Sequence, residues 1–153
     1  MKQLFGNSKN ILGVLTRGTD YIARKPKDHP IPPKIETIIV DVKKFDKKYN
    51  YDFIFFSTED EIIKSKFIHE FKDKLKLLNS RVKLKYDYSN KSFLAMNDEI
   101  NGNLDFMMNY VLNIIILSKC LDIISARCSG TAGLFILGVG FRHRKVYNLG
   151  DYP

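Results

Sequence analysis

The sequence has few of the residues that build disulfide scaffolds or metal sites. Only two cysteines occur, Cys120 and Cys128, and the three histidines lie far apart along the chain. Zinc sites are recognised by closely spaced cysteine and histidine pairs, and no such pair is present. We therefore expect a protein of a reducing compartment that folds without a disulfide framework or a structural metal.

Long apolar runs are missing too. The longest, Val111–Leu117 and Leu134–Phe141, fall well short of the ~20 residues that a membrane-spanning helix requires. The run Ile11–Leu15 is too short for the apolar region of a secretory signal. These absences predict no transmembrane segment, and a protein that is either cytoplasmic or peripheral to the inner face of a membrane.

Positive charge exceeds negative charge, with 25 Lys and Arg against 17 Asp and Glu, a formal net charge of +8. Such a balance fits nucleic acid, an anionic membrane face or anionic small ligands. The lysines are scattered, however; Lys43, Lys44, Lys47 and Lys48 alternate with acids, which favours solvated helix faces. Because no helix-turn-helix, zinc-finger or RNP-like signature occurs, we expect no nucleic-acid partner.

Short apolar runs alternate with helical periodicity along the 153 residues, the length of one domain spanning 1–153. Continuous apolar runs bounded by polar residues are typical of strands buried on both faces of a parallel sheet. We expect five strands, at Ile11–Thr16, Asp52–Ser57, Val82–Leu84, Ile123–Ser125 and Lys145–Leu149.

Helical periodicity fills most of the intervals between these runs. Thr58 and Glu61 match a T-x-x-E capping box, so a helix is expected to start there and to end at Asn79–Ser80. The proline-rich segment Ala23–Pro33 is expected to be a loop, and the aperiodic stretch 86–103 is either a lid or disordered. The other expected helices run from Pro33 to Tyr49, from Leu104 to Leu117 and from Ser129 to Leu137.

This alternation predicts an α/β fold, a Rossmann-like three-layer sandwich with a mostly parallel five-stranded sheet in the order 3-2-1-4-5. In that order the first and fourth strands lie side by side at the topological switch point, where ligands of such sheets bind. Three loops at strand ends are expected to converge there: Arg17–Tyr21, Ser57–Glu61 and Arg127–Gly133.

The first loop places Arg17 directly after a buried strand. Its guanidinium offers a planar fork of donors that suits phosphate oxygens, and Gly18 permits a sharp turn or a close approach to a ligand. The alternative is an Arg17 that pairs with Asp20 to hold the loop.

The third loop opens a helix with small residues. Backbone N–H groups there, together with the hydroxyls of Ser129 and Thr131, would cradle a phosphate. A plain helix cap with glycines for close packing is the alternative. No Walker P-loop or GxGxxG fingerprint is present, which excludes the standard NTPase and dinucleotide interpretations. Ser129 lacks a GxSxG elbow and no histidine is placed by pattern to activate it, so a serine hydrolase is weakly supported.

Together the three loops resemble a known set of motifs. VLTRGTDY at 14–21 is similar to the first motif of the fucosyltransferase superfamily, which includes the α-1,2-, α-1,6- and protein O-fucosyltransferases. STEDE at 57–61 resembles the second motif, and VLNIIILSKCLDIISARCSGTAG at 111–133 resembles the third. The three matches follow one another in the family's order and cover nearly the whole chain.

The resemblance implies one half of a GT-B glycosyltransferase that binds a nucleotide-sugar donor, GDP-fucose as the first guess, for inverting sugar transfer to a glycan acceptor in surface polysaccharide synthesis. No metal or other cofactor is required in that family. Arg17 would be the catalytic residue, because its charge stabilises the departing diphosphate. The donor-binding residues would be Gly18, Thr19, Asp20, Thr58, Asp60, Asn113, Arg127, Ser129, Gly130 and Thr131.

The sequence also departs from the family pattern. Leu15 replaces a histidine near the base, Gly18 replaces a second arginine of the α-1,6 branch, and Asn113 replaces an aspartate that recognises guanine. The donor is therefore GDP-fucose or another sugar nucleotide, and Asn113 is either a base-binding residue or simply a polar residue of the helix. The N-terminal acceptor half is expected to be absent, so the chain alone would transfer sugar poorly or not at all. A non-catalytic nucleotide-binding or interaction module is the alternative.

Overall fold

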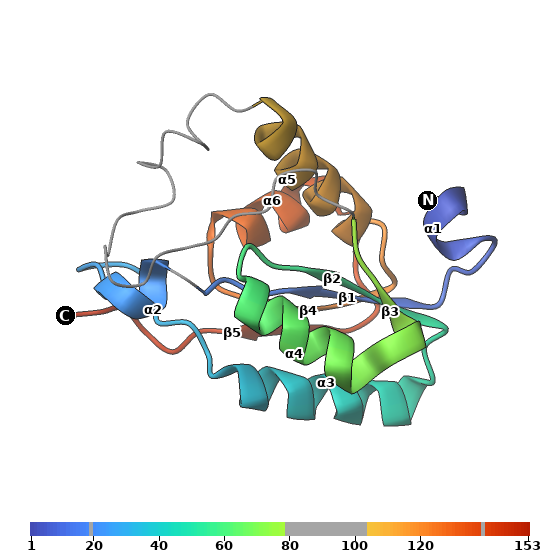
Figure 1. The fold of residues 1–153 in the computed structure, drawn as a ribbon, viewed down its shortest axis with the longest axis horizontal. Coiled ribbons are helices and arrows are strands. Elements are labelled where there is room, and N and C mark those ends of the chain that lie inside the picture. Colours follow the sequence, from blue (N-terminus) through green and yellow to red (C-terminus); the bar gives the residue numbers. More distant parts are fainter. Residues whose placement is uncertain (19, 79–103, 139) are drawn as a thin grey trace.

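A computed structural model of the chain describes residues 1–18, 20–78, 104–138 and 140–153. Five strands form one sheet in the order β3-β2-β1-β4-β5, and every neighbouring pair is parallel (Figure 1). Class, strand direction and strand order were all predicted from the sequence and are confirmed. The strands are β1 (Ile11–Leu15), β2 (Phe53–Ser57), β3 (Leu75–Lys76), β4 (Asp122–Ala126) and β5 (Arg144–Tyr147).

Helices cover both faces of the sheet and complete the three layers (Figure 1). Helices α3 and α4 lie on one face, and α5 and α6 lie on the other. No helix in the described ranges is long and apolar enough to cross a membrane. The helices are α1 (Lys2–Phe5), α2 (Asp20–Arg24), α3 (Ile35–Tyr49), α4 (Glu61–Phe71), α5 (Leu104–Leu117) and α6 (Ser129–Leu137), with a 3₁₀ turn η1 at Lys72–Lys74.

The central strand β1 is apolar throughout because both of its faces are covered. Leu12 and Val14 belong to the core beneath α3 and α4, whereas Ile11 and Leu15 belong to the core beneath α5 and α6. All five residues of β1 are buried. This alternation between two cores explains why the sequence shows a continuous apolar run instead of a two-residue period.

The third strand and the end of the fourth helix differ from the prediction. Helix α4 ends at Phe71, not at Asn79–Ser80, and β3 is formed by Leu75–Lys76, which had been assigned to the helix. Leu75 follows Phe71 by four residues, as the next apolar residue of a helix would. The apolar periodicity therefore continues past the end of α4 and does not reveal it. Lys72 adopts a positive φ of 43° there, which breaks the helix. The strand expected at Val82–Leu84 and the stretch 86–103 lie outside the described residues.

The predicted capping box is also wrong. The N-cap of α4 is Asp60, whose Oδ1 accepts hydrogen bonds from the backbone N–H groups of Ile62 and Ile63. Thr58 instead accepts a hydrogen bond from the Asp60 backbone through its Oγ1. Threonine and aspartate both serve as caps, and only the register of the helix decides between them. Helix α2 likewise takes in Ala23 and Arg24, which were expected in the loop.

Candidate functional site

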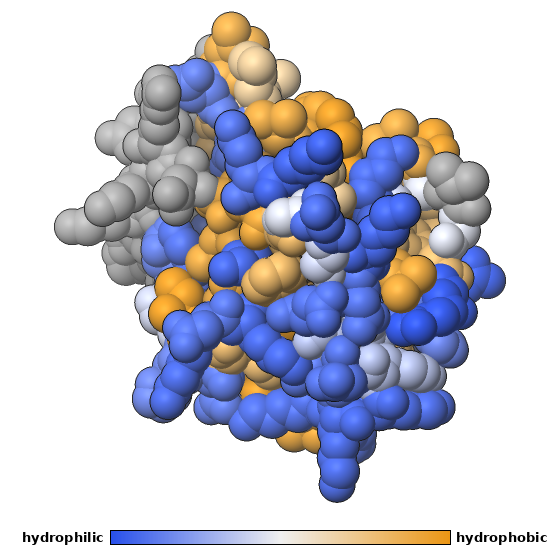
Figure 2. All heavy atoms as spheres, turned by 90° about the vertical axis from the view of Figure 1, so that its right-hand side faces the viewer, coloured by the Kyte–Doolittle hydropathy of each residue, from blue (hydrophilic) through white to orange (hydrophobic). Residues whose placement is uncertain are grey.

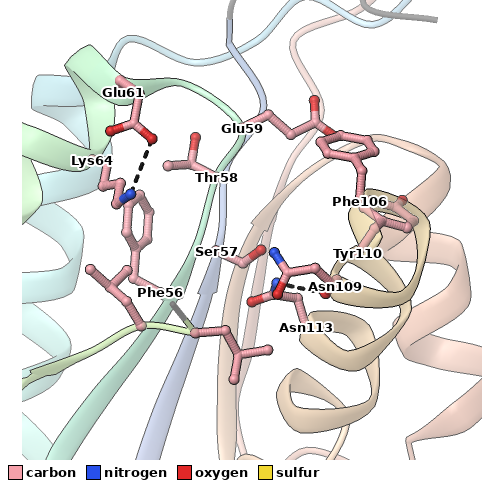
Figure 3. A pocket seen from close by; sticks show the side chains of 12 residues that line it. Phe56, Ser57, Thr58, Glu59, Glu61, Lys64, Phe106, Asn109, Tyr110 and Asn113 are labelled. Atoms are coloured by element: carbon pink, nitrogen blue, oxygen red, sulfur yellow. Dashed lines mark hydrogen bonds and ion pairs between the residues drawn. The ribbon is translucent and has the colours of Figure 1, made fainter. Parts of the chain in front are cut away.

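Two adjoining hollows open at the carboxyl edge of the sheet, where β1, β2 and β4 end. The larger has an empty volume of about 620 Å³ including its open side, and lies between the β2–α4 connection and α5 (Figure 3). The smaller, of about 310 Å³, reaches the end of β1 and the start of α6. Both are lined by Ser57, Thr58, Glu59 and Tyr110, so they lie on two sides of the same residues and are together termed the edge cleft.

Arg17 lines the smaller hollow, as the sequence predicted. Its side chain is half-buried, and its guanidinium carbon lies 4.1 Å from the centre of the Tyr21 ring. A planar guanidinium stacked on an aromatic face loses less freedom on binding than a mobile side chain. Arg17 therefore places a positive charge close to the carboxyl end of the central strand β1.

Thr16 lines the same hollow and is only 3% exposed. Its backbone N–H donates to the Ser57 carbonyl oxygen, but within the described residues its Oγ1 has no hydrogen-bond partner. Buried hydroxyls are normally paired, and an exception calls for a ligand or a water. Thr16 thus adds an unsatisfied hydroxyl one residue from Arg17.

The start of α6 forms the far wall of the smaller hollow. Cys128 is the N-cap residue, and in the described part of the chain no side chain caps this terminus. The first N–H groups of a helix lack partners within the helix and carry partial positive charge. The terminus can therefore accept an anion, which fits the predicted phosphate cradle.

The hydroxyl of Thr131 is not available for that cradle. Thr131 is buried, and its Oγ1 donates to the Ala126 carbonyl oxygen at 2.5 Å, tying α6 to the end of β4. Its proton cannot also be donated to a phosphate. Of the two hydroxyls predicted for this loop, only that of Ser129 is exposed, and it forms a hydrogen bond with Tyr110.

Tyr110 joins the two hollows from α5. Burial raises the pKa of its hydroxyl, with the neighbouring Cys128 and Glu59 adding to the rise, while a hydrogen bond with Ser129 and the charge of Arg17 act in the opposite direction. A Cβ atom at Gly130 would come within 2.9 Å of the Tyr110 hydroxyl oxygen. Gly130 is therefore needed so that α6 can approach Tyr110 closely.

The α5 wall of the larger hollow combines rings and amides. Phe106, Asn109, Tyr110 and Asn113 follow the spacing i, i+3, i+4 and i+7, so they share one side of the helix, which faces the hollow in Figure 3. Asn113 is 9% exposed, and its Nδ2 donates to the Asn109 carbonyl oxygen. Aromatic rings stack on planar bases and amides pair with their edges, so this wall suits a heterocycle.

Other predicted binding residues have structural roles instead. Arg127 pairs with Asp151 and Asn148 of the C-terminal tail and does not line the cleft. Asp60 is 2% exposed and caps α4. A Cβ at Gly18 would meet Ile63 at 2.6 Å, so this glycine permits close packing on α4. Thr19 and the side chain of Asp20 lie outside the described part of the structure.

Four polar or aromatic residues of the cleft are among those that the prediction missed: Thr16, Phe106, Asn109 and Tyr110. Three of them lie on the helix 104–117, whose strong apolar stripe drew attention away from its other side. The signal was present, because aromatic and amide residues recur at helical spacing along that side.

Within the described residues, no group of three or more His, Cys, Asp or Glu could hold a metal ion. No protein-family model matches the chain, and no curated protein matches it in sequence. The resemblance to the fucosyltransferase superfamily therefore rests on the three motifs alone and stays a prediction.

Proposed function

We propose that the edge cleft binds the diphosphate of a nucleotide sugar, and that the chain is the donor-binding half of a glycosyltransferase. One observation carries the proposal: Arg17 and the start of α6, which no side chain caps within the described residues, line one hollow at the switch point of a parallel sheet. The guanidinium and the helix N-terminus both favour an anion there.

The shape of the cleft suggests how the donor would lie. The smaller hollow would take the phosphates, close to Arg17 and Cys128, and the larger hollow would take the base, against the rings and amides of α5. Glu59 lines both hollows, and its carboxylate would repel phosphate from the β2 side. The diphosphate is thus expected on the side of the cleft that faces β1 and α6.

In this arrangement Arg17 would act on the leaving group. Negative charge grows on the terminal phosphate as the bond to the sugar breaks, and a fixed cation there stabilises it most in the transition state. Loss of one such donor typically lowers the rate by about 10²–10³. Arg17→Ala should therefore reduce sugar transfer more than it weakens donor binding.

Isothermal titration with GDP, GDP-fucose and UDP-sugars tests the binding step. We expect one of these ligands to bind, and Arg17→Ala to weaken it about 10- to 150-fold, the range for hydrogen bonds to charged groups. Arg127→Ala is the matched control, since that arginine pairs with the tail outside the cleft and its loss should leave affinity unchanged. If none of the ligands binds, or if Arg17→Ala binds as well as the parent, the site assignment is wrong.

The second candidate is a module that binds a nucleotide without transferring sugar. It is favoured by Asn113, which presents an amide to the larger hollow at the position where the family pattern has a carboxylate. Both candidates bind the donor, and the chain alone is expected to transfer sugar poorly, so only a positive signal separates them. Release of GDP from GDP-fucose that is lost in Arg17→Ala would exclude the non-catalytic module.

A further inference from the structure

Helix α5 carries a second apolar surface on the side that faces away from the sheet. Its inward side packs on the core and lines the edge cleft, with residues such as Asn113, Ile114 and Leu117 buried. The outward residues are apolar as well, yet they are between 41% and 68% exposed: Leu104, Met107, Met108, Val111, Leu112 and Ile115.

Helix α6 extends this surface. It lies beside α5 on the same face of the sheet (Figure 1), and its outer residues Phe135, Ile136 and Leu137 are exposed, Ile136 by 82%. Figure 2 shows apolar side chains gathered at the top of the molecule, where α5 and α6 lie in Figure 1. These outward residues of the two helices are termed the α5–α6 face.

The size of the α5–α6 face matches a subunit interface. Nine large apolar side chains exposed to this extent present an area on the order of 1,000 Å², comparable with the roughly 800 Å² per partner of a standard interface. The largest apolar patch of a typical monomer is only about 300–600 Å². Left in water, such a face would favour association.

The chemistry of the face favours protein over membrane. Among the 14 residues of α5 and the 9 of α6, Asp105 is the one charged side chain. Helices that lie in a membrane surface carry lysines and arginines along their polar side, and α5 has neither. Methionine and phenylalanine are enriched at the centres of protein interfaces, as Met107, Met108 and Phe135 are here.

The spacing on α5 points to another copy of the same helix. Leu104, Met108, Val111 and Ile115 follow steps of four, three and four residues, the heptad spacing at which two helices pack along a seam. This row of residues carries no charge, so it needs no complementary charges on a partner. A two-fold axis would pack the row on one copy against the same row on the other. We infer that the α5–α6 face binds a second copy of this chain in a two-fold dimer.

Sedimentation velocity over a wide range of protein concentration tests the dimer. Val111→Glu should weaken dimerisation by about 100-fold or more, because the seam would bury an unpaired carboxylate. Val40→Glu is the matched control: Val40 is 48% exposed on α3, close to the 52% of Val111, but lies on the opposite layer. This control should dimerise like the parent chain.

A second measurement covers the case in which Val111→Glu does not fold, as judged by circular dichroism. Under mild oxidation, Val111→Cys should form a disulfide-linked dimer much faster than Val40→Cys or the parent, whose Cys120 is buried and whose Cys128 is half-buried. A parent chain that stays monomeric, a dimer that Val111→Glu leaves intact, or a monomer that instead binds phosphatidylglycerol vesicles would each overturn the inference. Because none of these readouts needs a nucleotide, failure here is distinguishable from failure of the proposed donor site.

Discussion

The α3–α4 layer and the α5–α6 layer cover the same sheet but meet the solvent in different ways. About half of the 15 residues of α3 are charged, and the helix buries only its inward stripe. In α5 and α6 apolar residues lie on both the inward and the outward sides. The first layer exposes only scattered apolar residues such as Val40, Ile62 and Ile68, whereas the second exposes a continuous apolar stripe along α5. Both layers contribute residues to the cleft, and the α5–α6 layer adds an exposed apolar surface that α3 lacks.

Polar links reinforce the same contrast. The hydroxyl of Tyr147 on β5 donates to Asp41 on α3, and the Tyr51 hydroxyl, just beyond α3, donates to Asp122 on β4. Asp122 is fully buried and also accepts from Arg142 and from the His143 backbone. These buried carboxylates hold the α3 side to the sheet in one fixed arrangement, as satisfied polar networks do.

The largest expected effect is in the core beneath α3 and α4. Phe67 on α4 is fully buried and stacks on Phe56, with 3.8 Å between ring centres. Phe67→Ala should lower the free energy of unfolding by about 3–5 kcal/mol, measured by urea denaturation, because the cavity cannot collapse fully. Ile68→Ala, at a neighbouring residue that is 47% exposed, should change it by less than about 0.5 kcal/mol. Equal losses would mean that α4 does not pack as described.

The next effect concerns the charge of Asp122. Burial alone would raise the pKa of this carboxyl, but hydrogen bonds from Arg142, Tyr51 and the His143 backbone outweigh it and lower the pKa below its ordinary value. Because the pKa is lower in the folded chain, ionised Asp122 stabilises the fold at pH values above its pKa in the unfolded chain, about 3.9. This stabilisation is lost as the pH falls through the pKa of the folded chain. Asp122→Asn should cost about 2–3 kcal/mol at pH 7.

Urea denaturation of the parent and of Asp122→Asn at several pH values measures this linkage. The difference between the two proteins should shrink steadily below pH ~4, since the parent carboxyl then becomes neutral as well. A difference that stays constant down to pH ~2 would assign the role of Asp122 to shape rather than charge.

Alanine substitutions at two glycines of α6 should change stability by a smaller amount and in opposite directions. A Cβ at Gly130 would meet Tyr110, Ile114 and Leu15 within 3.2 Å, whereas a Cβ at Gly133 would meet its nearest neighbour at 3.5 Å. Gly130→Ala should therefore destabilise by about 1–3 kcal/mol. Gly133→Ala should stabilise by about 0.5–1 kcal/mol, because alanine is the better helix former. Thermal unfolding of both variants checks the pair, and a common sign would contradict the close approach of α6 to Tyr110.

The smallest effect is expected from the ion pairs that join α3 and α4 at the surface. Lys43 pairs with Glu70 and Lys66 with Glu36, all on exposed side chains. Water and salt screen such pairs, so Lys43→Ala and Lys66→Ala should leave the urea midpoint unchanged within error. A clear loss of stability would show that surface ion pairs, as well as the core, stabilise the α3–α4 layer.

The sequence was informative wherever an element is long and its pattern is uniform. Strands β1 and β2 and helices α3, α5 and α6 were predicted from apolar periodicity, and the strand order followed from the alternation. The two-residue strand β3 has no pattern long enough to recognise. The start of α4 was misplaced because Thr58 and Asp60 are both capping residues, and the choice depends on where the chain leaves β2.

For the site, residues close to one strand end were easier to predict than residues that tertiary structure brings together. Arg17 was identified because it directly follows a buried run. Arg127 was proposed by the same logic, but the C-terminal tail, distant in sequence, binds it through Asp151. Tyr110 was missed because its contacts with Gly130 and with the loop after β2 depend on how α5 lies over the sheet.

The most direct test of the account is a titration of the ¹⁵N-labelled chain with GDP, followed by the backbone amide signals. We expect the signals of Arg17, Thr58, Tyr110 and Cys128 to move together with one dissociation constant, because these residues line the smaller hollow. Those of Asp122 and Arg142, at the amino edge of the sheet, should stay in place. Shifts confined to the amino edge, or no shifts at any GDP concentration, would contradict a diphosphate site built on Arg17.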